Sequence, residues 1–430
     1  MTTVQAPAPT PAPVPRLTLP GGRSVRWLYF SLLAVTLMSI SRIATDANDL
    51  TSSNAFGAAL RLAVPVLLAG LGGLYAERAG VVNIGLEGMM VMGTWFAGWA
   101  GYEFGGWWGL LFGLLGGALG GLLHALATVT FGVDQIVSGV AINIIAPGVT
   151  RFLASEVFTG AAGGSSTSGP NVGRVGRFTL PFLAGGDFLG WDSPDVLGWF
   201  EDKEWFFVSD LSGMLRGLMV NLSWITVIAI ALVPISAFVL WRTAWGLRLR
   251  SIGEKPSAAD SLGVRVNWMK YQALFISGGL AGMGGAFLVI EQSLRYQENL
   301  PSGTGFIGLA ALIFGNWRPW GVAAGAGLFG LAQALQLRSD DSVRALLLVA
   351  ALALGLTGLY SLYTRRIAAV AVMAILTGVF LVAYLRTDEV AEELTYMTPY
   401  ITTLLVLIFA SQHLRPPAAA GKPWRKGQST

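Results

Sequence analysis

The 430-residue sequence contains no cysteine and only two histidines, His124 and His413. The absence of cysteine excludes disulfide bonds, thiolate metal sites and cysteine nucleophiles. Charged residues are scarce as well, at 12% of the chain, whereas an average soluble domain has about 25%. No P-loop, His-Glu-x-x-His or Gly-x-Ser-x-Gly motif is present. We therefore expect no enzyme activity, no bound metal and no cofactor on this chain.

Long apolar runs dominate the sequence, which is 53% hydrophobic. Backbone groups in lipid must be hydrogen-bonded internally, so only helices or closed barrels span a membrane. Runs of about 20 apolar residues fit helices, and the alternation of barrel strands is absent. We predict an all-α, polytopic helical membrane protein with about 10–12 transmembrane helices, some broken or re-entrant. The expected spans lie at about 24–45, 54–76, 80–103, 107–131, 136–153, 219–242, 267–290, 305–316, 321–337, 344–364, 368–386 and 397–414.

Basic residues in short loops indicate which side of the membrane is cytoplasmic. Residues 242–270 hold six basic and two acidic residues, and arginines precede the first span. We therefore place both termini in the cytoplasm and the Gly- and Ser-rich loop 154–218 outside. The expected divisions are a disordered Pro-rich cytoplasmic tail (1–22), a transmembrane domain (23–414) with a cytoplasmic loop at 243–266, and a basic cytoplasmic tail (415–430).

One stretch, residues 72–90, combines charges, an amide and glycines inside a membrane region. Glu77 and Arg78 are adjacent and predict a structural ion pair at a turn. Asn83 and Glu87 are four residues apart and would share one face of a helix. A carboxylate inside a membrane segment usually faces the bundle interior, an aqueous path or a partner. The candidate substrate-path residues are Asn83, Glu87, Asp134, Ser138 and Asn143.

For each of these residues the alternative role is interhelical hydrogen bonding, which contributes only about 1 kcal/mol. His124 lies on a Gly-rich apolar run and is expected to be a hydrogen-bonded packing residue. The spacing of Gly113, Gly116, Gly117 and Gly120 on the same run predicts close helix packing.

The cytoplasmic loop 246–264 carries signals for a short helix. Ser257 and Asp260 resemble a capping box, which marks a helix start. Gly263 is a suitable helix end. A helix at about 257–262 would lie at the membrane surface and could pass movement from a soluble partner to the adjoining spans. The alternative is an ordinary amphipathic loop held by lipid phosphates.

Four stretches in order along the chain resemble the permeases of ABC importers for nucleosides and simple sugars, a family that includes branched-chain amino-acid permeases. They are residues 77–89, 134–143, 246–264, and 306–321 followed by 327–333. The nucleoside branch is the most similar, particularly in the first two stretches. Residues 340–393, with two apolar runs, depart from the family pattern and resemble an insertion.

The resemblance implies a permease subunit that moves nucleosides or related simple sugars into the cytoplasm across the bacterial plasma (inner) membrane. It implies three partners: a second permease subunit, the same or different; a cytoplasmic ABC ATP-binding protein that carries ATP and Mg²⁺; and an external substrate-binding lipoprotein. The residues expected in the ATPase-coupling loop are Gly253, Glu254, Ala258, Ala259 and Gly263.

An ion-coupled secondary transporter of a small polar solute is the alternative. Glu87 and Asp134 could titrate in such a protein, and broken helices are typical of that class. This alternative leaves the loop 246–264 without an explanation.

Overall fold

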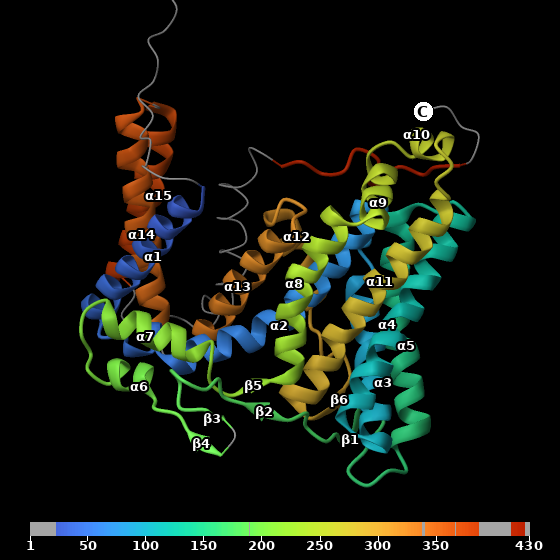
Figure 1. Cartoon of the computed structure of the whole chain (residues 1–430), viewed down its shortest axis with the longest axis horizontal. Helices are drawn as coiled ribbons and strands as arrows, with labels where there is room; N and C mark the ends of the chain where they lie inside the picture. The colour runs from blue at the N-terminus through green and yellow to red at the C-terminus, as the bar shows by residue number, and fades with distance from the viewer. Residues whose placement is uncertain (1–22, 189, 338–339, 366, 387–413, 426–430) are drawn as a thin grey trace, which may run out of the picture.

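The computed structural model describes residues 23–188, 190–337, 340–365, 367–386 and 414–425, most of them helical (Figure 1). The α-helices are α1 (Arg23–Thr45), α2 (Ser53–Arg78), α3 (Leu86–Phe104), α4 (Gly106–Ala125), α5 (Gln135–Phe158), α6 (Val196–Glu201), α7 (Val208–Gly217), α8 (Trp224–Arg242), α9 (Ala244–Glu254), α10 (Pro256–Ser261), α11 (Val266–Phe287), α12 (Thr304–Phe314), α13 (Pro319–Gln336), α14 (Asp340–Tyr363) and α15 (Ile367–Arg386). A 3-10 turn (Asn48–Thr51) precedes α2, and π-helical turns extend α4 (Leu126–Thr130) and α11 (Leu288–Ser293).

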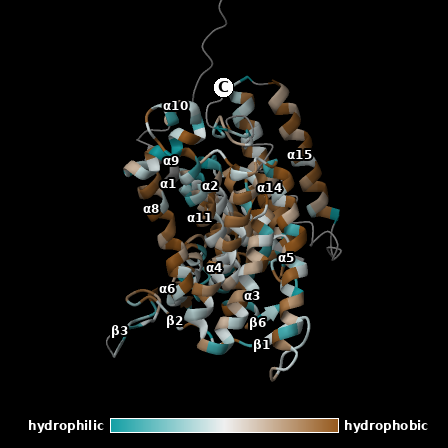
Figure 2. Ribbon diagram, turned by 90° about the vertical axis from the view of Figure 1, so that its right-hand side faces the viewer, coloured by the Kyte–Doolittle hydropathy of each residue, from teal (hydrophilic) through white to brown (hydrophobic). Residues whose placement is uncertain are grey.

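Within the described residues, seven helices are long and apolar enough to cross a membrane: α2, α4, α5, α8, α11, α14 and α15. The prediction of an all-α polytopic membrane protein is therefore confirmed. No residue of α15 is buried, and its apolar residues appear brown in Figure 2. Both features are expected for a helix that faces lipid. The expected tail 1–22 lies outside the described residues, as does nearly all of the expected span 397–414.

The centre of the bundle is held together by glycine contacts between α4 and α11. A Cβ placed on Gly117 of α4 would lie 2.3 Å from the carbonyl oxygen of Gly278 and 2.4 Å from Cα of Gly282, both on α11. Only glycine permits such a close approach of two helix backbones, as in small-residue packing of membrane helices. The packing predicted from the glycine spacing at 113–120 is thus confirmed.

The loop between α5 and α8 lies at the opposite end of the bundle from α9 and α10 (Figure 1). α5 extends to Phe158, past its expected end at 153, because no breaker interrupts it there. Short antiparallel strands organise the loop: β1 (Ser168–Asn171) pairs with β6 (Arg295–Gln297), β2 (Arg177–Phe178) with β5 (Leu222–Ser223), and β3 (Asp187–Phe188) with β4 (Trp191–Asp192).

Two arginines fix this loop through ion pairs. Arg177 binds Glu291, which is in the π-helical turn after α11, with Nη2 2.8 Å from Oε2. Arg216 on α7 pairs with Asp195 at 2.7 Å and with Glu201 at 3.3 Å. Burial acts to raise the pKa of Asp195, but hydrogen bonds from Arg216 and Gly198 outweigh it and hold the pKa below its usual value.

α1, α14 and α15 form a group at one side of the bundle (Figure 1). The Ser41 hydroxyl of α1 donates to the carbonyl of Ala345 in α14 at 2.7 Å. α14 and α15 follow one another as a helical pair, which agrees with the two apolar runs expected between 340 and 393.

The glycine packing predicts a sharp difference between two substitutions. Gly117→Leu should force α4 and α11 apart and cost about 1–3 kcal/mol or more, the usual range for overpacking. Gly327→Leu is the control, because a Cβ on Gly327 of α13 meets no atom of the described residues within 4 Å. Thermal unfolding in detergent should show a lower midpoint for Gly117→Leu alone, and equal midpoints would contradict the packing described.

Candidate functional site

Helices α2 and α3 are separated by an unwound segment, residues 79–85. α2 ends at Arg78, Gly80 adopts a left-handed backbone with φ +78°, and α3 begins only at Leu86. A left-handed glycine after the last turn is a common helix end. The expected helix at 80–103 therefore starts six residues late. The prediction that Asn83 and Glu87 share a helix face was wrong, because Asn83 precedes the helix.

Side chains from neighbouring helices hydrogen-bond the backbone of the unwound segment at Val82 and Ile84, and that of α3 at Gly88. Gln135 accepts the Val82 N–H at 2.7 Å, and His124 Nε2 lies 3.1 Å from the Val82 carbonyl. Asn143 donates to the Ile84 carbonyl at 3.0 Å and accepts the Gly88 N–H at 2.8 Å. These bonds replace those that a continuous helix would make, since a backbone group left unpaired in the bilayer costs several kcal/mol.

His124 links this segment to Ser138. The Val82 carbonyl can only accept, so His124 Nε2 must carry the proton. In the neutral ring Nδ1 is then an acceptor, and the Ser138 hydroxyl donates to it at 2.9 Å. His124 is 0% exposed. The predicted packing role of His124 is confirmed, with a specific partner at each nitrogen.

Asn83 is fully buried between α3 and α11. Its Nδ2 donates to Ser277 Oγ at 2.9 Å. Its Oδ1 is also buried and has no hydrogen-bond partner among the described residues. A buried acceptor of this kind calls for an explanation in a native structure, such as a ligand, a water or a second conformation.

Glu87 caps the start of the short helix α12. Its two carboxylate oxygens accept the backbone N–H groups of Gly303 and Gly305, each at 2.6 Å. These donors are the N-cap of α12 and a residue of its first turn, where N–H groups have no partner within the helix. Glu87 also lies in the first turn of α3, so its carboxylate meets the positive ends of two helix dipoles. α12 has only 11 residues, and the expected short segment is confirmed.

Glu77 and Arg78 do not pair with each other, so the predicted ion pair was wrong. Glu77 accepts the indole N–H of Trp317 at 2.5 Å, and Arg78 Nη2 donates to the Trp317 carbonyl at 2.6 Å. Adjacent helix residues point in different directions, which favours separate partners over a mutual contact. Arg78 also lies over the ring of Trp241, 5.3 Å from its centroid. Together these contacts fix the end of α2 to the turn between α12 and α13.

The expected coupling loop contains two helices. Residues 244–254 form α9, which was not predicted, and α10 begins at Pro256 without a side-chain cap. The predicted capping box at Ser257 was therefore wrong, because proline at the first helical position starts the helix one residue earlier. Gly263, with φ +84°, follows the end of α10 as expected.

The five coupling-loop residues divide into a buried and an exposed set. Gly253 packs on the end of α2, since a Cβ on it would lie 2.2 Å from the Arg78 carbonyl oxygen. Ala259 is also buried, whereas Glu254 and Ala258 are exposed. The loop thus has one face on the membrane helices and one face available to a partner.

Four of the candidate substrate-path residues converge at the unwound segment: Asn83, Glu87, Ser138 and Asn143. Asp134 does not join them. It is exposed and caps α5 by accepting the N–H groups of Ile136 at 2.8 Å and Val137 at 3.1 Å. Gln135 and Ser277 belong to the site but were not predicted. Gln135 adjoins Asp134 at the start of an apolar run, which was the available signal, whereas Ser277 is one small residue among many.

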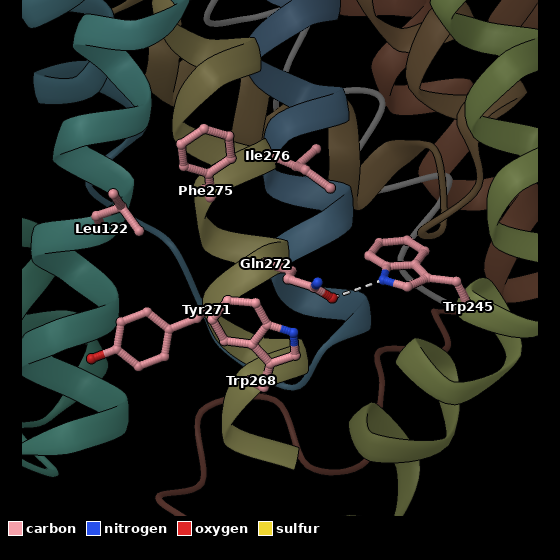
Figure 3. Close-up of a pocket in the computed structure, with 7 residues that line it drawn as sticks. All are labelled: Leu122, Trp245, Trp268, Tyr271, Gln272, Phe275 and Ile276. Carbon is pink, nitrogen blue, oxygen red and sulfur yellow. Dashed lines mark hydrogen bonds between the residues drawn. The ribbon is translucent and has the colours of Figure 1, made fainter. Parts of the chain in front are cut away.

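A separate pocket of about 360 Å³ lies beside α11, against α4 and α9 (Figure 3). It is lined by Leu122, Trp245, Trp268, Tyr271, Gln272, Phe275 and Ile276. The indole N–H of Trp245 donates to Gln272 at 3.0 Å. None of the residues at the unwound segment lines this pocket, and Trp268 is 60% exposed. The pocket is therefore distinct from the candidate path.

A polytopic helical bundle whose buried polar side chains gather at an unwound membrane segment has the architecture of a membrane transport protein. The chain belongs to the family described as branched-chain amino acid transport system / permease component, whose model matches residues 56–352. The match runs past 340, the expected start of the insertion, and includes the unwound segment, α9, α10 and α12.

Curated relatives agree with this family. The chain is 39% identical to the guanosine ABC transporter permease protein NupQ of Bacillus subtilis, over 65% of this chain and 81% of the relative. It is 34% identical to the nucleoside ABC transporter permease protein NupC of Lactococcus lactis, over 63% and 78%. It is 33% identical to a putative glucose ABC transporter permease, TsgC13 of Haloferax volcanii, over 66% and 77%. No solved structure matches the chain. The chain is a multi-pass ABC permease subunit, not an enzyme.

The double cap at Glu87 predicts a specific loss on substitution. Glu87→Gln keeps the size of the side chain but offers only one acceptor oxygen to the two N–H groups of α12. Leaving one buried donor unpaired should cost about 1–3 kcal/mol. Asp134→Asn is the control, since Asp134 is exposed and asparagine caps helices about as well. Thermal unfolding in detergent measures both, and a wild-type midpoint for Glu87→Gln would contradict the capping role.

Proposed function

We propose that this chain is one of two permease subunits of an ATP-driven importer that carries nucleosides into the cytoplasm. The observation that supports this most is its similarity, at 39% and 34% identity, to permeases named for guanosine and nucleoside transport. The similarity to a permease named for glucose makes simple sugars the other substrate class to be tested.

The substrate path in this proposal passes the unwound segment. Nucleosides present hydroxyl groups and ring nitrogens, which amides and hydroxyls recognise by hydrogen bonding. Asn83, Ser138 and Asn143 offer such groups, and the partnerless Oδ1 of Asn83 is an acceptor not engaged within the described residues. Glu87 contributes by fixing the start of α12. Asp134, at the exposed start of α5, would act at the mouth of the path.

The partners in this proposal bind at opposite ends of the bundle. A cytoplasmic ATP-binding protein, which holds ATP and Mg²⁺, would dock on the end of α9 and on α10, through exposed residues such as Glu254 and Ala258. An external substrate-binding lipoprotein would dock on the loop between α5 and α8. A second permease subunit, identical or different, would complete the path. This chain itself would bind no cofactor.

The orientation follows from charge. Arg242, Arg248, Arg250, Lys255 and Arg265 surround α9 and α10, and an excess of basic residues marks the cytoplasmic side. With α9 and α10 inside, the strand-containing loop is outside, and both termini are cytoplasmic. The membrane in this proposal is the bacterial plasma (inner) membrane.

Coupling would run from α10 to the unwound segment through Gly253. Because Gly253 lies directly against the end of α2, a displacement of α9 and α10 must move residues 78–80 or separate from them. The segment 79–85 is held by side-chain hydrogen bonds and not by a helix, so it can change its shape at lower cost than α2 or α3. Alternation between outward-open and inward-open states would use this freedom.

Transport assays test the proposal directly. Membrane vesicles containing the complete complex are supplied with labelled guanosine, other nucleosides, nucleobases and glucose, with wild-type ATPase or an ATPase disabled in its Walker motif. We expect uptake of nucleosides that is lost with the disabled ATPase. Uptake of glucose alone would mean that the substrate class is simple sugars and not nucleosides. Uptake that survives the disabled ATPase would favour the ion-coupled alternative.

A further inference from the structure

Residues 414–425, here named the C-terminal strap, lie across the end of the bundle that carries α9 and α10. Figure 1 shows this segment in red, crossing the upper part of the view beside α9 and α10. The sequence predicts only a basic tail here. The strap instead makes backbone hydrogen bonds to the membrane domain, and two of its residues are among the buried apolar ones, Ala419 and Trp424.

The strap is bonded to the end of α9. The Ala419 N–H donates to the Gly253 carbonyl at 2.8 Å, and the Ala418 N–H donates to the Glu254 carboxylate at 3.4 Å. Gly253 and Glu254 are two of the expected coupling residues. The strap therefore holds the position at which α9 turns into α10.

The strap also touches the unwound segment. A Cβ placed on Gly80 would lie 3.3 Å from Cα of Gly253 and 3.4 Å from Cβ of Ala419, so three backbones meet at this point. Further along the strap, a Cβ on Gly421 would lie 3.8 Å from a methyl group of Val82. The same twelve-residue strap thus contacts α9 and the segment that carries Asn83.

The two ends of the strap are anchored on other turns of the same face. The Arg415 N–H donates to the Asn316 side chain at 2.9 Å, in the turn between α12 and α13. Trp424 is 9% exposed and lines a groove of about 450 Å³ with Val264, in the turn after α10, and Val266, at the start of α11. The Arg425 guanidinium lies beside Gly132, before α5.

We propose that the C-terminal strap is a positioning element that transmits the movement of α9 and α10 to the unwound segment 79–85. The proposal rests on the proposed ATP-driven function. The strap is bonded to Gly253, packed on Gly80 and anchored at the turns on either side. Because of these contacts, α9, α10 and the unwound segment move together. Without it, α9 could be displaced while residues 79–85 stay in place, and ATP would be hydrolysed without transport.

The experiment compares transported nucleoside with hydrolysed ATP in proteoliposomes that contain the full complex. Trp424→Ala removes the anchor, and Ala419→Pro removes the N–H that bonds Gly253. Trp424→Phe keeps a ring in the groove and deletes no hydrogen bond, because the Trp424 indole N–H has no partner among the described residues. Trp320→Ala, which removes a tryptophan that is 63% exposed on α13, is the matched control.

We expect the first two variants to lower the ratio of nucleoside to ATP roughly tenfold, which is the size of a typical coupling free energy. Trp424→Phe and Trp320→Ala should keep the wild-type ratio. An unchanged ratio in Ala419→Pro and Trp424→Ala would overturn the proposal. So would parallel losses of transport, hydrolysis and bound ATPase, which indicate a docking role only.

A variant that does not assemble and a failure of the proposed function give different results. If Trp424→Ala does not assemble, Ala419→Pro decides by its own ratio. If the wild-type complex takes up nucleoside without ATP, the proposed function fails, and the strap proposal fails with it regardless of the variants.

Discussion

The structure depends on the requirement that every backbone N–H and C=O at membrane depth finds a partner within the protein. Two segments of this chain meet it without being continuous helices. Residues 81–85 bond to Gln135, His124 and Asn143, and the start of α12 bonds to Glu87. The polar residues that stand out in the apolar sequence are therefore the ones that supply hydrogen bonds to the backbone of these non-helical segments.

The same arrangement joins a rigid part and a deformable part. α4 and α11 are in backbone contact through glycines and have little freedom to shift. The unwound segment is bonded by side chains, which can exchange partners without unfolding a helix. It lies between this rigid pair and the α9–α10 surface, and a change of its shape breaks no helical backbone hydrogen bond, unlike a change within α2 or α3.

Composition and apolar run length were sufficient to predict the helical membrane class, most of the helices, the short α12 and the glycine packing. The site was predicted in part. Asn83, Glu87, Ser138 and Asn143 stand out as polar residues in apolar runs, and they do converge. The placement of Asn83 before the helix that holds Glu87 could not be predicted, because Gly80 ends α2 by its left-handed backbone and no local pattern shows where α3 begins.

Two other features were inaccessible to sequence reasoning for physical reasons. Glu77 and Arg78 both bind Trp317, which is far away in the chain, and such a tertiary contact has no local signature. The C-terminal strap is held by backbone N–H groups and one tryptophan. Its prolines and basic residues are typical of a free tail, so its packing follows from the turns it meets and not from its own composition.

The most direct test of this account is thiol labelling of Asn83→Cys in the otherwise cysteine-free chain. Asn83 is 0% exposed in the structure, and the proposed mechanism requires the unwound segment to open during transport. An aqueous thiol reagent should react slowly at rest, faster during ATP turnover, and slowly again when transported nucleoside is in excess. A labelling rate that is the same with and without ATP and nucleoside would contradict the account.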